Sequence, residues 1–247
     1  MILPNQKDAI HKAWMYRILT SICDNQELAD AIYFKGGTCA AMRGLLNRFS
    51  IDLDFDYVGK LSELAKTRKM LEQVFIQLGL EIKDKSAKVP QYFLKYPTAK
   101  DGERNTIKID ITMPCPKSNK YELVRLSDID RIIHCQTVET MFANKLVALI
   151  NRYEKNNSIA GRDMYDIHYF FINNFKYDKE VIIERRGNKD LKKFFTELIN
   201  FIENNITDTI ISQDINMLLS YQEFKKIRKI LKQEVLMFLR DEIERLK

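Results

Sequence analysis

The sequence FKGGTCAAMRGLLNRFSIDLDF, residues 34–55, decides how the rest of the chain is interpreted. A hydrophobic segment at 31–34 ends at a Gly-Gly-Thr turn, and a short helix is expected at 39–46. Apolar and acidic residues then alternate over 51–57, which predicts a strand because successive side chains of a strand point to opposite faces. The stretch therefore predicts a strand, a glycine turn, a short helix and a second strand.

Two features of this stretch predict a chemical site. Asp52 and Asp54 share the polar face of the second strand, roughly 7 Å apart at the backbone, so their carboxylates can converge on one divalent ion. Gly36 and Gly37 precede a helix N-terminus, where backbone N–H groups and the positive end of the helix dipole suit a phosphate. The sequence thus places a phosphate cradle close to a paired-carboxylate metal site.

Length and composition are those of a soluble globular protein. The 247 residues are enough for one large domain or two modest ones. No apolar run approaches the ~18 residues of a membrane span, and the N-terminus lacks the order of a signal peptide. The four cysteines are scattered and histidines are few, which argues against structural zinc and favours reduced thiols. We therefore expect a cytoplasmic protein with no membrane partner.

The net charge of +6 at pH 7 has two interpretations. One is a solubilising surface, and the other is a polyanionic partner such as nucleic acid. Basic residues gather at 185–193 and 225–229, where they could contact phosphates, although each tract taken alone suits a solvated helix face.

The remaining patterns predict the fold class. Helical spacing of apolar residues predicts helices at 6–23 and 61–78. The next segments predict strands, with an antiparallel hairpin at the turn signal Asp101-Gly102; they are 80–86, 91–97 and 105–113. The chain beyond about residue 137 predicts only helices, at 137–154, 161–174, 178–186, 190–205, 208–220 and 222–246. We therefore expect an α+β fold, with a mixed sheet flanked by helices in a domain at 1–130 and a helical bundle domain at 131–247.

Three further residues are candidates for the site. Asp110 lies in the middle of a predicted strand, where propensity disfavours it, so either that face is solvated or Asp110 is a third carboxylate beside Asp52 and Asp54. Lys145 lies among apolar neighbours on its helix, where it either extends harmlessly to solvent or holds a phosphate. Asp166 shares a helix face with Asp163; the helix dipole can explain an acid in the first turn at Asp163, and it explains Asp166 less well because Asp166 lies further into the helix.

In combination these motifs resemble the nucleotidyltransferase superfamily, and more narrowly the AbiEii/AbiGii-type toxin nucleotidyltransferases of bacteria. The resemblance rests on KGGT at 35–38 and RFSIDLDF at 48–55. The strand with Asp110, the helix with Lys145 and the R-D-x-Y-D run at 162–166 follow in the same order. It covers about residues 31–172, and the chain after about residue 175 has no matching motif.

The resemblance implies a nucleotidyltransferase-like fold and a role for each matching residue. The residues implied to contact the nucleotide are Lys35, Gly36, Gly37, Thr38, Arg48, Ser50 and Lys145. Asp52 and Asp54 would bind Mg²⁺ or Mn²⁺, with Asp110 as the third acid and metal ligand. Lys145 would contact the triphosphate of the NTP substrate, and Asp166 would complete the catalytic set.

We therefore expect a metal-dependent nucleotidyltransferase that moves a nucleotidyl group from an NTP to RNA. The resemblance implies an acceptor such as the 3′ end of a tRNA, a toxin–antitoxin or phage-defence role, and an antitoxin protein as a partner. One alternative is a nucleotide- or RNA-binding module without turnover in isolation, and another is a protein whose activity a partner controls. A metal-dependent nuclease could use the same carboxylates, but the Gly-Gly turn argues for the phosphates of a nucleotide.

Overall fold

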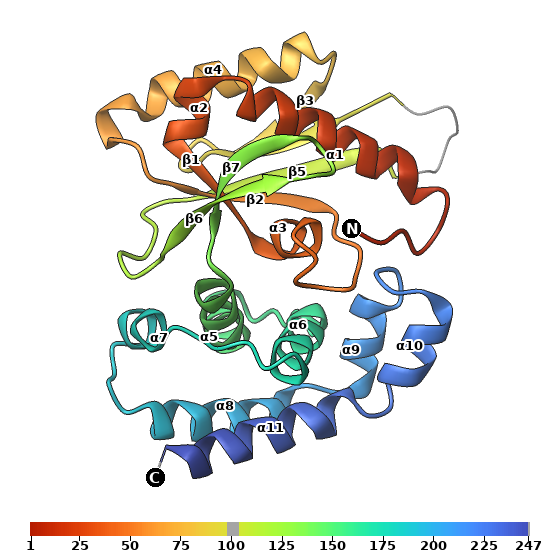
Figure 1. Ribbon diagram of the computed structural model, residues 1–247, viewed down its shortest axis with the longest axis vertical. Coiled ribbons are helices and arrows are strands. Elements are labelled where there is room, and N and C mark those ends of the chain that lie inside the picture. The colour runs from red at the N-terminus through yellow and green to blue at the C-terminus, as the bar shows by residue number, and fades with distance from the viewer. Residues whose placement is uncertain (98–103, 247) are drawn as a thin grey trace.

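The computed structural model describes residues 1–97 and 104–246, which form a sheet layer followed by a helical layer (Figure 1). The first layer consists, in chain order, of α1 (Asp8–Cys23), α2 (Gln26–Ala31), β1 (Ile32–Lys35), α3 (Gly36–Met42), β2 (Asp52–Tyr57), the 3-10 turn η1 (Leu61–Glu63), α4 (Leu64–Gln77), β3 (Glu81–Lys85), β4 (Gln91–Lys95), β5 (Thr106–Thr112), β6 (Tyr121–Leu126) and β7 (Arg131–Gln136).

These strands form one mixed seven-stranded sheet in the order β3-β4-β5-β2-β1-β7-β6. The strand β2 pairs parallel to β5 and β1 pairs parallel to β7, whereas the other neighbours are antiparallel. The predicted mixed sheet is therefore confirmed. The strands β4 and β5 pair antiparallel as expected, and the predicted turn at Asp101-Gly102 lies outside the described residues.

Apolar side chains on alternate strand positions fix which way the sheet faces. Leu53 and Phe55 on β2 are fully buried, as are Ile107 and Ile109 on β5. The helices α1, α2 and α4 lie on the side of the sheet away from the helical layer, and α3 lies on the side that faces it (Figure 1). The polar positions of β2 and β5 therefore remain available for a site between the two layers.

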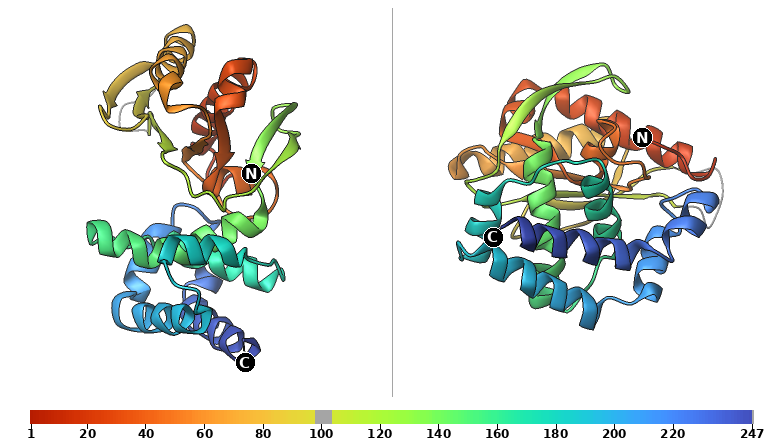
Figure 2. Two further views of the ribbon diagram at one scale, coloured as in Figure 1. Left: turned by 90° about the vertical axis from the view of Figure 1, so that its left-hand side faces the viewer. Right: turned by 60° about the horizontal axis from the view of Figure 1, so that its bottom comes forward.

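The second layer consists of α5 (Val138–Asn156), α6 (Gly161–Ile172), α7 (Lys179–Arg186), α8 (Leu191–Asn205), α9 (Asp208–Ile215), α10 (Tyr221–Ile227) and α11 (Leu231–Arg245). Thr137 caps the start of α5 by accepting a hydrogen bond from the N–H of Thr140, and Asn157 ends this helix in the left-handed conformation. The left view of Figure 2 places these helices together below the sheet layer. Buried apolar residues of both layers form one continuous cluster.

Three element predictions were wrong. Residues 115–136 were expected only to contain a boundary, but they form the hairpin β6–β7, so the sheet continues to Gln136, past the boundary predicted after residue 130. The helix expected at 222–246 is two helices, α10 and α11. The short helix expected to begin at residue 39 begins at Gly36. The division into two domains stays a prediction.

Across residues 1–97 and 104–246, none of the helices combines the length and the apolar character needed to cross a bilayer.

Candidate active site

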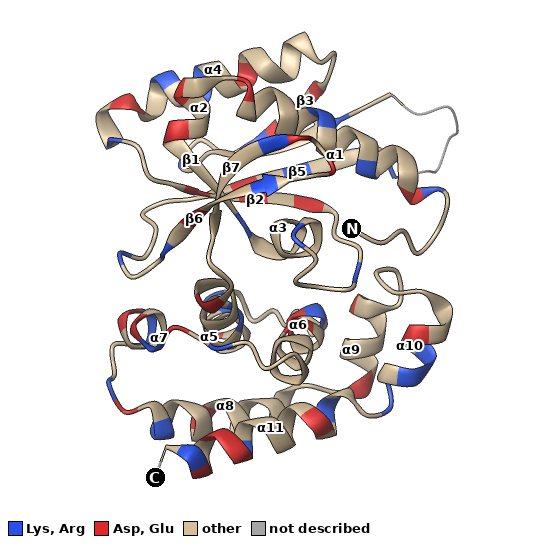
Figure 3. Cartoon of the chain, in the orientation of Figure 1, with Lys and Arg blue, Asp and Glu red and all other residues tan. Residues whose placement is uncertain are grey.

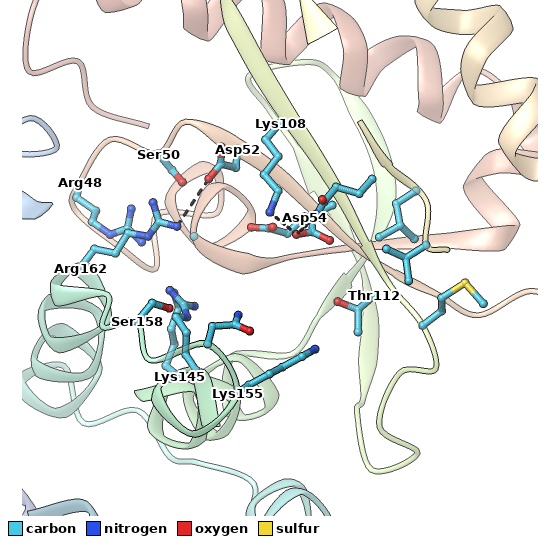
Figure 4. Close-up of a pocket in the computed structure, with 18 residues that line it drawn as sticks. Arg48, Ser50, Asp52, Asp54, Lys108, Thr112, Lys145, Lys155, Ser158 and Arg162 are labelled. Carbon is cyan, nitrogen blue, oxygen red and sulfur yellow. Dashed lines mark hydrogen bonds and ion pairs between the residues drawn. The ribbon is translucent and has the colours of Figure 1, made fainter. Parts of the chain in front are cut away.

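The carboxylates of β2 and β5 meet because the two strands pair in parallel register. Asp54 is the direct neighbour of Asp110, and Asp52 is the neighbour of Lys108. Asp52, Asp54 and Asp110 all line one cavity of about 600 Å³ between the sheet and the helical layer (Figure 4). The structure therefore brings together the three acidic residues that the sequence singled out as metal ligands.

Asp54 carries the least compensated negative charge of these three. Burial raises its pKa, the charges of Asp52 and Asp110 raise it further, and Lys35 and Lys145 offset only part of this effect. Asp110 accepts hydrogen bonds from Lys108 Nζ at 2.5 Å and from Gln91 Nε2 at 3.1 Å. Asp52 lies 3.7 Å from Arg162. Asp54 is thus a partly buried carboxylate surrounded by like charge, which an added cation would relieve.

The donor set suits a hard divalent ion. Mg²⁺ and Mn²⁺ prefer carboxylate oxygens, which Asp52 and Asp54 offer from one strand face. As the side chains lie, the described part of the chain contains no group of three or more Asp, Glu, His or Cys residues arranged to hold a metal. Asp110 is drawn toward Lys108 and would have to leave it to become a third ligand. Asp52 and Asp54 are therefore the residues that fit the ion.

The glycine turn brings backbone into close contact with the site. Gly36 begins α3 directly after β1 with φ +78°, and a Cβ added there would collide with the Asp54 carboxylate. A Cβ at Gly37 would lie 2.5 Å from Arg48 Nη2 and 3.1 Å from Ser50 Oγ. Gly37 and Ser50 both line the large cavity beside Asp52. Both positions therefore need glycine so that the backbone can pass the site.

Thr38 and Lys35 of the KGGT motif make structural contacts inside the protein, and neither residue lines the large cavity. Thr38 is fully buried, and its hydroxyl donates to the backbone carbonyl of Asp52. Lys35 Nζ lies 2.6 Å from both Asp56 Oδ1 and Thr112 Oγ1. Asp56 is fully buried and also accepts hydrogen bonds from Asn119, Tyr121 and Gln136. Both residues thus position the strand on which Asp54 lies.

A buried ionic network joins the loop before β2 to the helical layer. Arg48 donates from Nε and Nη2 to the two carboxylate oxygens of Asp166, at 2.5 and 2.7 Å. Lys145 Nζ lies 2.6 Å from Asp163 and 2.8 Å from Asp166. Arg152 lies 3.2 Å from the other oxygen of Asp163. Asp166 does not line the large cavity. Its carboxylate instead holds Arg48 and Lys145, and both of these residues line the cavity.

The positive charges of this network lower the pKa values of Asp163 and Asp166. Burial raises the pKa of Asp163, but the Lys145 ammonium and the Arg152 guanidinium outweigh it and lower the pKa to about 2. Burial likewise opposes the ionised form of Asp166, and Arg48 and Lys145 bring its net pKa below the usual value. Both carboxylates are ionised at neutral pH, so they fix the ammonium of Lys145 at the cavity wall. These contacts do not fit the interpretation in which the Lys145 side chain extends harmlessly to solvent.

Four basic residues at the cavity were not among the sequence candidates: Lys108, Arg152, Lys155 and Arg162. Lys108 shares the polar face of β5 with Asp110, and Arg152 and Lys155 follow Lys145 at helical spacing along one face of α5. That alternation and spacing are the signals that could have identified them. The charge-coloured view places Lys and Arg on α5 and α6 across from Asp on β2 (Figure 3).

The cavity thus has an acidic wall from the sheet and a basic wall from the helices. Its volume of about 600 Å³ lies within the range of small-molecule sites. A polyphosphate could contact the basic wall directly and the acidic wall through a divalent ion. The arrangement can therefore stabilise negative charge that moves between phosphoryl oxygens.

Comparisons with known proteins identify the family and the fold. The model of the family described as nucleotidyl transferase AbiEii toxin, type IV TA system, matches residues 17–232. A crystal structure of a candidate nucleotidyltransferase from H. pylori has 19% identity and a TM-score of 0.63, with 98% of this chain and 99% of that chain covered. JHP933 from Helicobacter pylori has 20% identity and a TM-score of 0.56, with 99% and 98% covered. No curated protein matches the chain.

Proposed function

Because the chain belongs to the AbiEii nucleotidyl transferase toxin family, we propose that it is an NTP-dependent enzyme that transfers a nucleotidyl group to RNA in the cytoplasm. One observation carries the proposal: the parallel register of β2 and β5, which sets Asp54 beside Asp110 in the cavity that Lys145 and Arg152 also line. This juxtaposition supplies both the carboxylates and the cations that phosphoryl chemistry needs.

Asp52 and Asp54 would hold the divalent ion, Mg²⁺ or Mn²⁺. When bound, the ion neutralises phosphoryl oxygens and lowers the pKa of a coordinated hydroxyl. Gly37 and Ser50, which line the large cavity, would border the phosphates, with Ser50 Oγ as a hydrogen-bond donor, and Gly36 would let the backbone pass close to Asp54. Lys145 would face the leaving pyrophosphate, and Arg152 and Arg162 would neutralise the remaining charge.

Asp110 is the group best placed to take the proton of the attacking hydroxyl. In the proposed step, the acceptor oxygen forms a bond to the α-phosphorus while the bond from that phosphorus to the bridging oxygen breaks. Pyrophosphate leaves with the electron pair, and the hydroxyl proton passes to Asp110. Lys108 Nζ lies 2.5 Å from the Asp110 carboxylate and fixes its position beside the cavity.

Lys35, Thr38, Arg48 and Asp166 would act through other residues. Lys35 and Thr38 hold β2 in place through Asp56 and through the carbonyl of Asp52. Arg48 and Asp166 orient Lys145 and join the two layers. We therefore assign Lys35, Thr38 and Asp166 as positioning residues. Arg48 also positions Lys145 through Asp166, but it lines the large cavity as well, so its guanidinium would border the substrate.

The acceptor and the partner follow from charge and from the family. A net charge of +6 favours a polyanion, and we propose RNA, with the 3′ end of a tRNA as the acceptor. The family is one of type IV toxin–antitoxin systems, which supports a toxin role and an antitoxin as a partner.

The test is an incorporation assay. Purified protein with Mg²⁺ receives each of the four labelled NTPs together with total bacterial RNA, beside the variant Asp52→Ala/Asp54→Ala. Label on an RNA band that the variant and a metal chelator abolish is the expected result, and it identifies donor and acceptor together. Nucleotide binding without label from any NTP would contradict transferase activity and leave a binding module or a partner-activated protein.

A further inference from the structure

The large cavity is not the whole of the space between the two layers. A smaller cavity of about 240 Å³ lies against it, and the two share Asp54, Asp110, Thr112, Lys145 and Arg152. The smaller cavity extends toward α3, the start of α5 and α7. The two spaces therefore meet at the carboxylates and cations to which the transfer step is assigned.

A reaction between two substrates needs such a junction, because the donor phosphorus and the acceptor hydroxyl must meet. Resting on the proposed function, we infer that the large cavity binds the NTP and the small cavity binds the 3′-terminal nucleotide of the RNA acceptor, whose phosphate Arg185 holds.

Charge assigns the donor to the large cavity. That cavity is lined by Lys108, Lys155 and Arg162 in addition to the shared Lys145 and Arg152, and these cations suit a triphosphate. The small cavity adds only Lys35 and Arg185 to the shared cations, and Asp56 already neutralises Lys35. Of the two cations that the small cavity adds, Arg185 is therefore the one left to bind a ligand. One cation suits the single charge of a phosphodiester.

Arg185 is not paired with a carboxylate in the described part of the chain, although the charge of Asp56 acts on it from a distance. Its guanidinium donates to the side chain of Asn144 at 2.6 Å and to its carbonyl at 3.4 Å. The neighbouring Arg186 is paired with Glu154 at 2.9 Å and with Glu197 at 3.6 Å. Arg185 is thus a partly buried charge held in place by an amide, with capacity left for an anion.

The rest of the small cavity suits a nucleoside. Its walls combine apolar side chains from α3, α5 and α6, namely Ala40, Met141, Ala148 and Phe170, with polar side chains such as Thr112, Gln136 and Asn144 and with the charged residues already named. The apolar side chains offer a surface on which a base or ribose can pack, and the polar ones offer hydrogen-bond partners that can orient it. Arg185 also borders an open depression with Lys155 and Arg186, through which the remaining RNA chain can leave.

Two variants test the assignment. Arg185→Gln removes the charge and keeps a hydrogen-bonding side chain, and Ala148→Phe fills the small cavity from a half-buried position. Lys193→Gln, an exposed cation on α8, is the matched charge control. Binding is measured for fluorescein-labelled unfractionated bacterial tRNA over a range of salt, and for each unlabelled NTP by calorimetry. Urea unfolding checks that each variant is folded.

The expected result is a separation of the two affinities. Arg185→Gln should raise the Kd for tRNA about tenfold, as the loss of a charged hydrogen bond predicts, and reduce the salt slope by about 0.7. Ala148→Phe should weaken tRNA binding by a similar factor. NTP affinity should stay at the wild-type value in both variants, and Lys193→Gln should change neither affinity.

Other outcomes overturn the assignment. Loss of NTP affinity with unchanged tRNA affinity would reverse the roles of the two cavities, and wild-type tRNA affinity in both variants would remove RNA from the small cavity. Neither result touches the proposed function if the wild-type protein still labels RNA. Conversely, a wild-type protein that labels nothing fails the proposed function, while the two affinities still decide which cavity takes which ligand.

Discussion

Asp54 and Asp56 lie on the same polar side of β2, yet their surroundings are opposite. Asp56 is fully buried, pairs with Lys35 and accepts hydrogen bonds from three further side chains. Asp54 has like charges beside it, and its pKa is raised. Strand alternation predicts that both carboxylates share a face, but it carries no information on their partners, so the sequence could not separate a structural acid from a candidate catalytic one.

Gly36→Ala tests the close approach of the glycine turn to Asp54. The substitution adds a Cβ that collides with the Asp54 carboxylate at a positive φ, so it should abolish transfer and cost about 1–2 kcal/mol of stability from backbone strain alone. Gly44→Ala is the control, because Gly44 also has a positive φ, +74°, with open space around its Cβ position. Gly44→Ala should lose similar stability and keep transfer. Equal transfer in the two variants would contradict the account.

The depressed pKa of Asp163 predicts a pH dependence of stability. The value is about 2 in the folded protein, below the ~3.9 of an unfolded chain. Its ionised form therefore stabilises the fold above about pH 4, and this contribution, about 2 kcal/mol, is lost as the pH falls toward 2. Urea unfolding should show the stability difference between wild type and Asp163→Asn shrinking below about pH 4. A difference that stays constant with pH would rule out this role.

Among the elements, prediction failed where local pattern was weak. The strands β6 and β7 lie at one side of the sheet, and exposed Leu123 and Ile132 break the simple alternation of polar and apolar positions there. The apolar stripe of α10 and α11 runs from Ile227 to Leu231 at helical spacing, and neither glycine nor proline marks the break between them. Elements with strict periodicity, such as β2, β5 and α5, were predictable because their burial pattern follows from sequence alone.

The loop between α3 and β2 is an element whose position depends on the helical layer. Phe49 N–H donates to the carbonyl of Leu218 at 2.8 Å, and Tyr165 donates to the carbonyl of Asn47 at 3.0 Å. Arg48 adds the paired bonds to Asp166. These contacts join residues far apart in the chain, so no spacing in the sequence could reveal them. They also place the glycine turn and β2 opposite Lys145.

Arg48→Met tests this connection. The variant leaves the fully buried Asp166 with Lys145 as its remaining partner, and breaking a buried ion pair in this way costs about 3–5 kcal/mol. A double-mutant cycle with Asp166→Leu in urea unfolding should give a large coupling energy, because the double variant removes both charges together. Additive losses would contradict the proposed link between the layers.

At the scale of the whole molecule, the two layers supply different halves of one site. The sheet contributes Asp52, Asp54 and Asp110, and the helical layer contributes Lys145, Arg152 and Arg162. The family model spans both layers, over residues 17–232, and solved structures with the same fold cover nearly the whole chain. The helices after residue 175 matched no motif in the sequence; Arg185 on α7 now gives that part of the chain a proposed role in binding the acceptor.

The most direct test compares the transfer rate per folded molecule of Asp54→Asn and Asp56→Asn. Asp54→Asn should lose transfer by at least about a hundredfold and remain at least as stable as wild type, because it removes repulsion beside Asp52 and Asp110. Asp56→Asn should lose about 3 kcal/mol of stability, because it leaves Lys35 without its counter-ion, and should lose far less transfer than Asp54→Asn, because Asp56 acts on the site only by positioning β2. We therefore expect Asp54→Asn to lose transfer without losing stability, and Asp56→Asn to lose mainly stability. Wild-type transfer by Asp54→Asn would contradict the account.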